Sequence, residues 1–197
     1  MKKRVILFLL GEKKGQNMRL DKFNNDSFKR GRHWIIEAVW VVIQSLLFST
    51  GLPGSHWRCF LLSIFGASIA SGVVIKPRVM VKFPWRLHIG SHTWIGEGVW
   101  IDNLGNIEIG SNCCVSQGAY FCTGSHDWSK TSFDLIVKPI TVKDYAWVAA
   151  KAVVAPGVIV GEGAVLGLGS VAVNDLQPWS IYMGNPAILK GPRPKSD

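Results

Sequence analysis

Apolar residues recur at every sixth position in the central part of this chain, in three blocks separated by shifts of register. A second column, four residues after each member of the first, holds only small or β-branched side chains. A period of six differs from the repeat of a helix and from the alternation of a half-buried strand. The first column consists of Ile89, Ile95, Ile101, Ile109, Val115, Phe121, Val142, Val148, Val154, Val160 and Leu166. The second consists of Thr93, Val99, Gly105, Cys113, Ala119, Ser125, Ala146, Ala152, Val158, Ala164 and Ser170.

This spacing predicts a short extended segment with one inward side chain, then a tight corner, then the same unit again. Three such segments close one turn of a triangular coil, and stacked coils bury a core that no single coil could bury alone. Ile69, Ile75 and Val81 extend the first column weakly upstream. We therefore expect an all-β solenoid over residues 67–176.

One segment interrupts the repeat inside the solenoid. Residues 127–139 do not follow the six-residue pattern, and they end at Pro139. Because such a segment cannot be accommodated in the coil, we expect it to protrude as a loop. The interruption begins directly after His126, which closes a block of repeats.

Residues 34–48 form the most hydrophobic segment and are predicted to be helical, with an end near Gly51 and Pro53. A second amphipathic stretch follows at 57–65. The first segment is shorter than the roughly 20 residues that span a bilayer. Two interpretations remain open. The helices either cap the open end of the solenoid, which would expose strand edges, or make peripheral contact with a membrane, helped by the basic residues that precede them.

The chain is thus predicted to have three parts: an N-terminal extension and helical cap at 1–66, the solenoid at 67–176, and a basic tail at 177–197. Its 197 residues fit one domain. The first seventeen residues begin like a signal peptide, but the apolar run is short and lacks a small-residue cleavage site. They are therefore left out of the predicted fold.

A net charge of +9 favours acidic partners, such as the phosphates of a cofactor or an anionic membrane surface. The Lys and Arg residues are scattered or terminal and follow no nucleic-acid-binding motif, so no nucleic acid is expected. The four cysteines, at positions 59, 113, 114 and 122, lack the spacing of a zinc site. We expect reduced thiols and no metal, as is usual in the cytoplasm.

His126 is the candidate catalytic residue, because an imidazole titrates near neutrality and can take and return a proton. The alternative is a surface histidine at a corner, with no role. Asp127 could orient the imidazole. Adjacent side chains diverge on extended backbone, however, so this would require a turn.

Several motifs accompany the repeat, and they are Phe65-Gly66-Ala67, Pro84-Trp85, Cys122-Thr123-Gly124-Ser125-His126-Asp127, Ala155-Pro156-Gly157-Val158 and Gly184-Asn185-Pro186-Ala187. Taken together, the repeat and these motifs resemble the hexapeptide-repeat acyltransferases over roughly residues 18–190. The resemblance is closest to the colanic-acid and exopolysaccharide O-acetyltransferase branch, which is related to the galactoside, maltose and nodulation-factor enzymes. It implies a left-handed parallel β-helix, a homotrimer and acetyl-CoA as co-substrate.

The resemblance places the family's catalytic base at His126, which would activate an acceptor hydroxyl for direct attack on acetyl-CoA. It also implies that the loop at 127–139 helps to enclose the acceptor. Residues assigned to acceptor binding are Asn103, Ser125 and Trp128, although Asn103 could equally be a turn-forming residue. The sugar-binding asparagine of the galactoside enzymes has no counterpart in this sequence.

For the donor, the family binds CoA in a groove between two subunits of the trimer. Trp147 would flank the thioester or the pantetheine arm, and the Ala150 N–H would stabilise the oxyanion. The glycines around Leu168 would let pantetheine approach the backbone. Lys190 and Arg193 would meet CoA phosphates, unless they are solvated tail charges. The cofactor-binding residues are therefore predicted to be Trp147, Ala150, Gly167, Leu168, Lys190 and Arg193.

The sequence thus predicts a cytoplasmic, acetyl-CoA-dependent O-acetyltransferase that acts on a sugar hydroxyl of an exopolysaccharide or other surface-glycan precursor. Alternative acceptors are an antibiotic, an amino sugar or serine. A different class would be a non-catalytic hexapeptide-repeat protein, either structural or metal-binding. The metal-binding alternative resembles the gamma-class carbonic anhydrases, but the surroundings of His88, His92 and His126 do not match that pattern.

Overall fold

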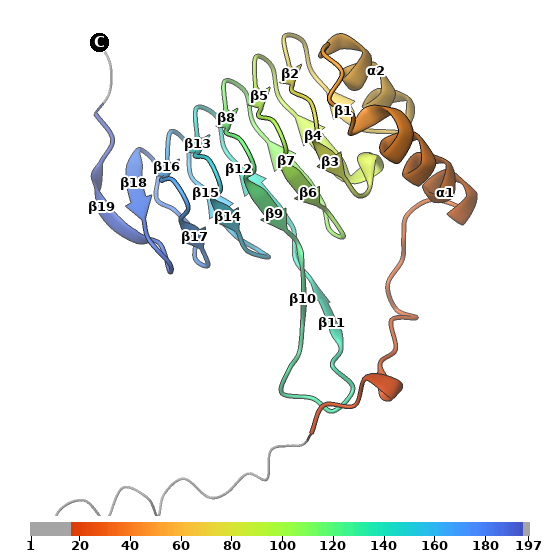
Figure 1. Cartoon of the computed structure of the whole chain (residues 1–197). Helices are drawn as coiled ribbons and strands as arrows, with labels where there is room; N and C mark the ends of the chain where they lie inside the picture. The colour runs from red at the N-terminus through yellow and green to blue at the C-terminus, as the bar shows by residue number, and fades with distance from the viewer. Residues whose placement is uncertain (1–16, 195–197) are drawn as a thin grey trace, which may run out of the picture. The chain divides into compact units, whose positions relative to one another are not determined.

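The computed structural model describes residues 17–194, so the predicted extension at 1–17 lies outside the described residues except for Asn17. The chain forms two compact units (Figure 1). The smaller unit contains the described residues up to Phe28 together with His126–Ile136. The larger unit contains Lys29–Ser125 and the chain from Val137 onward.

Three sheets run along the larger unit, and successive strands of the chain alternate among them, as expected for a three-sided coil (Figure 1). The first sheet contains β1 (Ser68–Ile69), β4 (Leu87–Ile89), β7 (Ile107–Ile109), β12 (Ile140–Val142) and β15 (Ile159–Val160). The second contains β2 (Val74–Ile75), β5 (Trp94–Ile95), β8 (Cys114–Val115), β13 (Trp147–Val148), β16 (Val165–Leu166), β18 (Ser180–Met183) and β19 (Ile188–Pro192). The third contains β3 (Met80–Val81), β6 (Trp100–Asp102), β9 (Tyr120–Cys122), β14 (Val153–Val154) and β17 (Val171–Ala172).

The six-residue repeat builds the core of this coil. Every member of the first apolar column is buried. The strands pair in parallel, so anchors from successive turns stack directly, as Ile95 does on Val115. Most of the small column is buried as well, whereas Ser125 is exposed. The predicted parallel β-helix of the hexapeptide-repeat type is confirmed.

Close stacking of turns explains why a glycine often follows the apolar anchor. A Cβ atom on Gly90 would lie 2.6 Å from backbone atoms of Gly110 and Ser111 in the next turn. A Cβ on Gly96 would lie 2.7 Å from the backbone of Ser116 and Gln117. Even an alanine at these positions would therefore push neighbouring turns apart, and only glycine permits the observed spacing.

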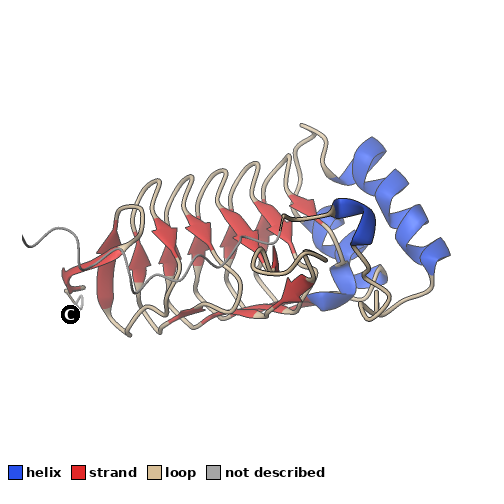
Figure 2. Ribbon diagram, turned by 90° about the horizontal axis from the view of Figure 1, so that it is seen from below, coloured by secondary structure: helices blue, strands red, loops and turns tan. Residues whose placement is uncertain are grey.

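Two helices and a π-helical turn cover the end of the coil where the first strands lie (Figure 2). They are α1 (Trp34–Ile43), η3 (Gln44–Phe48) and α2 (His56–Ile64). The Trp40 indole is buried and donates a hydrogen bond to the Val81 carbonyl at 2.7 Å. The Gln44 side chain accepts a 2.7 Å bond from the Val81 N–H. These contacts satisfy the edge strand β3, which is the function expected of a cap.

Arg58 on α2 holds the segment between the helices in place. Its side chain is fully buried. The guanidinium donates hydrogen bonds to four backbone carbonyls, those of Phe48, Thr50, Leu52 and Gly54. A buried charge is costly without partners, and here the peptide dipoles of one loop supply them. One buried side chain therefore holds the segment that connects η3 to α2.

The chain beyond the predicted boundary at 176 is more ordered than a tail. Strand β18 joins the second sheet next to β16, and β19 pairs antiparallel with β18. The Gly-Asn-Pro-Ala motif lies between these strands, with a cis peptide bond before Pro186. The solenoid sheet thus continues through residues 180–192.

The predicted excursion at 127–139 contains β11 (Leu135–Val137), which forms a two-stranded sheet with β10 (Gly124–His126), the strand directly before the excursion. Within the smaller unit, the Arg19 N–H donates to the Thr131 carbonyl at 2.9 Å, next to the short helix η2 (Leu20–Lys22). In the larger unit, η4 (Pro84–Arg86) precedes β4. Across residues 17–194, none of the helices has the length and apolar character needed to traverse a bilayer.

Candidate functional site

His126, at the end of β10, is surrounded by aromatic side chains of the smaller unit. The Phe133 ring stacks on the imidazole with a centroid distance of 4.2 Å and an interplanar angle of 2°. The Phe23 ring meets it edge-on at 5.5 Å. The imidazole remains partly exposed. The two ring contacts therefore fix the plane of the imidazole, while the residue keeps part of its surface exposed.

A backbone carbonyl determines the tautomer of His126. Nδ1 lies 2.8 Å from the Phe133 carbonyl oxygen. Because a carbonyl oxygen only accepts, Nδ1 must carry the proton, and Nε2 of the neutral ring keeps its lone pair. Phe133 has a φ of 51°, a region that non-glycine residues rarely occupy. The strained turn thus presents this carbonyl to the imidazole.

Asp127 does not take the orienting role that its position suggested. Its carboxylate accepts hydrogen bonds from the N–H and hydroxyl of Ser129, at 3.1 and 2.5 Å. These bonds lower the pKa of the Asp127 carboxyl. Asp127 directly follows the last residue of β10, and neighbouring side chains on extended backbone diverge, so its carboxylate points into the loop rather than toward His126. The orientation of His126 comes instead from the Phe133 backbone, which sequence reasoning did not identify.

The structure also corrects the expectation for Asn103. Its side chain is fully buried. Its carbonyl oxygen accepts from the Phe83 N–H at 2.8 Å, and its amide donates to the Phe83 carbonyl at 2.7 Å. Because the side chain is fully buried and both of its ends pair with the Phe83 backbone inside the coil, it does not reach an acceptor at the surface, and the structure shows it linking two turns of the coil. Ser125 and Trp128 are exposed, Trp128 at 82%.

Thr123 fixes the point where the chain leaves the coil. Its buried hydroxyl donates to the Asp102 carbonyl and accepts from the Gly105 N–H, both at 2.9 Å. The Lys138 N–H returns to the Thr123 carbonyl at 2.9 Å. The departure to β10 and the return after β11 are therefore held together at one corner.

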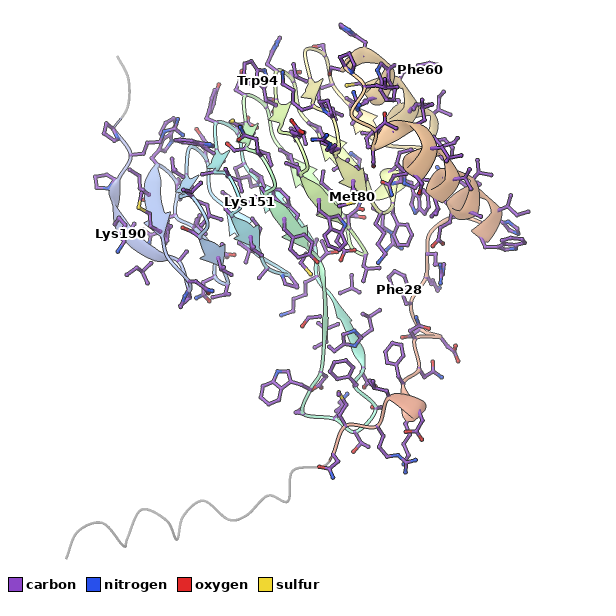
Figure 3. All side chains as sticks on the ribbon, in the orientation of Figure 1. Phe28, Phe60, Met80, Trp94, Lys151 and Lys190 are labelled. Carbon is purple, nitrogen blue, oxygen red and sulfur yellow. The ribbon has the colours of Figure 1, made fainter. Side chains whose placement is uncertain are left out.

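An outward-facing set of polar and aromatic side chains on β3, β6 and β9 was not identified from the sequence. Trp100 on β6 pairs with Met80 on β3 and with Tyr120 on β9. Two residues further along, Asp102 pairs with Cys122. Figure 3 labels Met80 on this part of the coil. The Trp100 and Tyr120 rings lie 4.8 Å apart. Met80, Trp100 and Tyr120 are each twenty residues apart in the sequence, so a search for outward-facing residues at that spacing would have found this set.

Asp102 is the centre of this outward set. The Tyr120 hydroxyl donates to its carboxylate at 3.1 Å, and the Lys82 ammonium lies 3.3 Å from the other oxygen. Burial raises the pKa of Tyr120, and the neighbouring Cys122 and Asp102 raise it further. The phenol therefore stays protonated and continues to donate. The Asp102 carboxylate is mostly buried, whereas the Trp100 indole beside it is exposed and provides an apolar platform on which a ring could pack.

The predicted donor residues on the second sheet do lie together. Trp147 faces outward, 44% exposed, and its indole donates to the Ser116 hydroxyl at 2.9 Å. Gly169, in the next turn, donates from its N–H to the Ala150 carbonyl at 2.9 Å. Leu168 is 75% exposed. Among the backbone hydrogen bonds of residues 17–194 that lie outside helices and strands, none has the Ala150 N–H as its donor.

A groove of about 410 Å³ lies on the same sheet. Trp94, Cys114, Ser116 and Gln117 are among its lining residues, and Ser116 joins it to Trp147. A larger hollow of about 720 Å³ is lined by residues such as Lys143 and Asp175, and it contains none of the predicted site residues. Neither hollow is lined by a predicted site residue, but the smaller groove adjoins Trp147 through the hydrogen bond to Ser116 and is therefore the better candidate for a cofactor arm.

The two basic residues predicted to bind phosphate differ in their surroundings. Arg193 donates to the carbonyls of Tyr145 and Gly163, at 2.8 and 3.0 Å, and is thereby held against the coil. Lys190 lies exposed on β19 (Figure 3). Lys190 is therefore the freer of the two to meet a phosphate.

The cysteines are free thiols in the structure. Burial raises the pKa of Cys113 to about 11, so its reactive thiolate is scarce near neutrality. Within residues 17–194 there is no group of three or more His, Cys, Asp or Glu side chains that could hold a metal ion.

Comparisons with known proteins bear on the family and the fold of the chain. No protein-family model matches the chain. WcaF of Escherichia coli K12, a protein named as a colanic acid biosynthesis acetyltransferase, is 37% identical over 161 residues, which cover 81% of this chain and 88% of WcaF.

Two solved structures share the fold. A hexapeptide-repeat acetyltransferase from Vibrio cholerae O1 biovar eltor, complexed with acetyl-CoA, has a TM-score of 0.74 at 21% identity and covers 86% of this chain and 98% of its own. A maltose O-acetyltransferase from Clostridium difficile 630 has a TM-score of 0.71 at 20% identity, and the match covers 82% of this chain and 88% of the maltose enzyme.

Proposed function

The chain belongs to the hexapeptide-repeat acetyltransferases, the family of its colanic acid biosynthesis relative, and from this premise we propose that it transfers an acetyl group from acetyl-CoA to a sugar hydroxyl. The acceptor is an exopolysaccharide or other surface-glycan precursor. The observation that carries the proposal is the orientation of His126, whose Nδ1 is bound to the Phe133 carbonyl so that Nε2 can act as the base.

The reaction follows from these groups. Nε2 of His126 removes the proton from the acceptor hydroxyl as its oxygen forms a bond to the thioester carbon. The carbonyl oxygen becomes an oxyanion, to which the Ala150 N–H donates; such a donor contributes about 3 kcal/mol. Collapse breaks the carbon–sulfur bond, and the imidazolium returns its proton to the departing CoA thiolate. No enzyme nucleophile is needed.

The remaining assignments follow the family. Acetyl-CoA is proposed to bind along Trp147, Gly167, Leu168 and Lys190 in a groove completed by a neighbouring subunit of a homotrimer. The Vibrio cholerae relative was solved with acetyl-CoA, which supports the choice of donor. Because acetyl-CoA is a cytosolic metabolite, we propose a cytoplasmic location, with peripheral contact at the inner face of the membrane.

An assay of acceptor-stimulated thiol release tests this function. Purified protein with acetyl-CoA should release free CoA thiol when a surface-polysaccharide repeat unit is added, and mass spectrometry should find an added O-acetyl group. Amino sugars, serine and an aminoglycoside serve as comparison acceptors. If acetyl-CoA binds but only an amine is acetylated, the hydroxyl acceptor is wrong. If acetyl-CoA does not bind, the enzymatic proposal fails.

We further propose that Asp102 contributes to the acceptor site, and Asp102→Asn tests this. The variant keeps the shape of the side chain but loses the charge that the Tyr120 and Lys82 groups surround. A hydrogen bond to a charged group contributes about 1.5–3 kcal/mol, so KM for the sugar should rise about tenfold to a hundredfold. KM for acetyl-CoA should stay unchanged. Glu108→Gln, on the first sheet, is the matched control, and an equal effect in both variants would rule out this role.

A further inference from the structure

The helical cap presents an outer face that is almost entirely apolar. Besides the residues that pack on the coil, α1, η3 and α2 carry large hydrophobic side chains that lie open to solvent. Examples are Trp34 at 66% exposure, Leu46 at 76%, Phe60 at 64% and Ile64 at 60%. Phe60 lies on α2, as labelled in Figure 3. We call this the cap face.

Packing of the coil does not explain the cap face. On α1 only Trp40 is buried. The remaining positions of the helix include Ile35, Val41 and Val42, which are at least half exposed. A surface helix usually carries charged or polar side chains on its outer side. Clustered exposed apolar residues instead mark a contact with another apolar phase.

Charges around the cap face favour a negatively charged partner. Glu37, the acidic residue of α1, is ion-paired with Arg30 at 2.6 Å. Lys29 and Arg32 lie just before the helix, and both are exposed. The whole chain carries a net charge of +9. Basic residues next to an apolar helical face attract anionic lipid headgroups, at about 1 kcal/mol for each charge near the surface.

The dimensions fit a helix that lies in the bilayer interface. Helix α1 has 10 residues, which corresponds to about 15 Å, half the thickness of the hydrocarbon core. Trp34 begins the helix, close to the basic residues, and indoles prefer the headgroup level. An interfacial helix buries its apolar face to a depth of about 5–10 Å and keeps its charges in water.

We propose that the cap face docks the protein on an anionic lipid bilayer, with Leu46, Phe60 and their neighbours inserted and with Lys29 and Arg32 at the headgroups. This assigns the proposed membrane contact to defined residues. The cap face takes no part in the proposed acetyl transfer. Failure of the membrane proposal would therefore leave the proposed acetyltransferase activity intact, and failure of the activity would leave the membrane proposal intact.

Flotation of the full-length protein with lipid vesicles tests the proposal. One set of vesicles contains only phosphatidylcholine, and the other adds about a third of phosphatidylglycerol. The wild type should float with the anionic vesicles, and raising the salt tenfold should weaken binding, since screening shortens the range of the charges. The double variant Leu46→Ser, Phe60→Ser should lower the bound fraction at least about tenfold. The matched control is Val173→Ser, Ile188→Ser, which removes comparably exposed side chains from the coil.

Three results would overturn the proposal. The first is a wild type that does not float, or a cap-face variant that floats as well as the control. The second is light scattering that shows an oligomer broken by the cap-face variant alone, with no vesicle binding; the partner would then be a second copy of the chain. The third is a wild type that fails to float while a chain beginning at Met18 floats, which would identify the N-terminal residues as the occupant. Thiol release measured without lipid should be equal in all variants.

Discussion

Replacing His126 by alanine is expected to lower kcat for acetyl transfer by a factor of about 10²–10⁴, the usual contribution of a positioned general base. The binding of acetyl-CoA should be unchanged, because the imidazole acts on the acceptor hydroxyl rather than on the donor. Thiol release at saturating acetyl-CoA and acceptor measures the first quantity, and calorimetric titration with CoA measures the second.

The control for this prediction is the thermal stability of the variant. His126 packs between Phe23 and Phe133, so the thermal transition of the variant must be compared with that of the wild type. His88→Ala is the matched variant, because His88 is an exposed histidine on β4. If His126→Ala keeps more than about a tenth of the wild-type kcat, the proton is taken by another group and the proposed base is wrong.

Replacing Arg58 by alanine is expected to reduce the free energy of unfolding by about 3–5 kcal/mol, because the carbonyls of Phe48, Thr50, Leu52 and Gly54 lose their shared donor. The variant also leaves a cavity below the cap. For a chain of this size, such a loss lowers Tm by about 10 °C. Thermal unfolding followed by circular dichroism measures the effect.

A surface arginine provides the comparison for Arg58. Arg78 pairs with Glu97 at 2.6 Å, but both side chains are about half exposed or more. Such pairs contribute about 0–1 kcal/mol, so Arg78→Ala should change Tm by only a few degrees. Equal shifts in the two variants would mean that solvent replaces the guanidinium of Arg58 as a donor. The cap would then not depend on it.

These two predictions distinguish a residue that is proposed to act in the reaction from a residue that is expected to stabilise the fold. His126 is proposed to act through Nε2 and is expected to affect the rate with little effect on stability. Arg58 lies in the cap and is expected to affect stability first. A variant of Arg58 that reduces activity at low temperature, where the protein remains folded, would show that the cap also influences the reaction.

Much of the fold could be predicted from the sequence, because the same six-residue pattern of apolar and small residues recurs in every turn of the coil. Anchors such as Ile95 and Val160 are buried wherever the period places them. The helices were predictable from their hydrophobicity, whereas the strands β18 and β19 were not. Their segment has no six-residue period, and pairing with β16 decides its conformation.

The sequence offered the residue types of the candidate site, but it did not give the direction in which each side chain points. His126 and Trp147 stand out by identity and position. Asn103 and Asp127 looked equally suitable, yet one amide faces Phe83 and one carboxylate faces Ser129. Asp102 was missed because its partners Lys82 and Tyr120 each lie about twenty residues away in the chain. They meet only when successive turns stack.

By itself the sequence determined the solenoid and the burial of its anchors, and it supplied the histidine that we propose as the base, because these depend on local periodicity and on side-chain chemistry. Only the tertiary structure decided which nitrogen of His126 is free, which asparagine is buried and which face of the cap stays uncovered. Each of these depends on a hydrogen bond or a contact between distant segments. Such contacts arise only after the chain has folded.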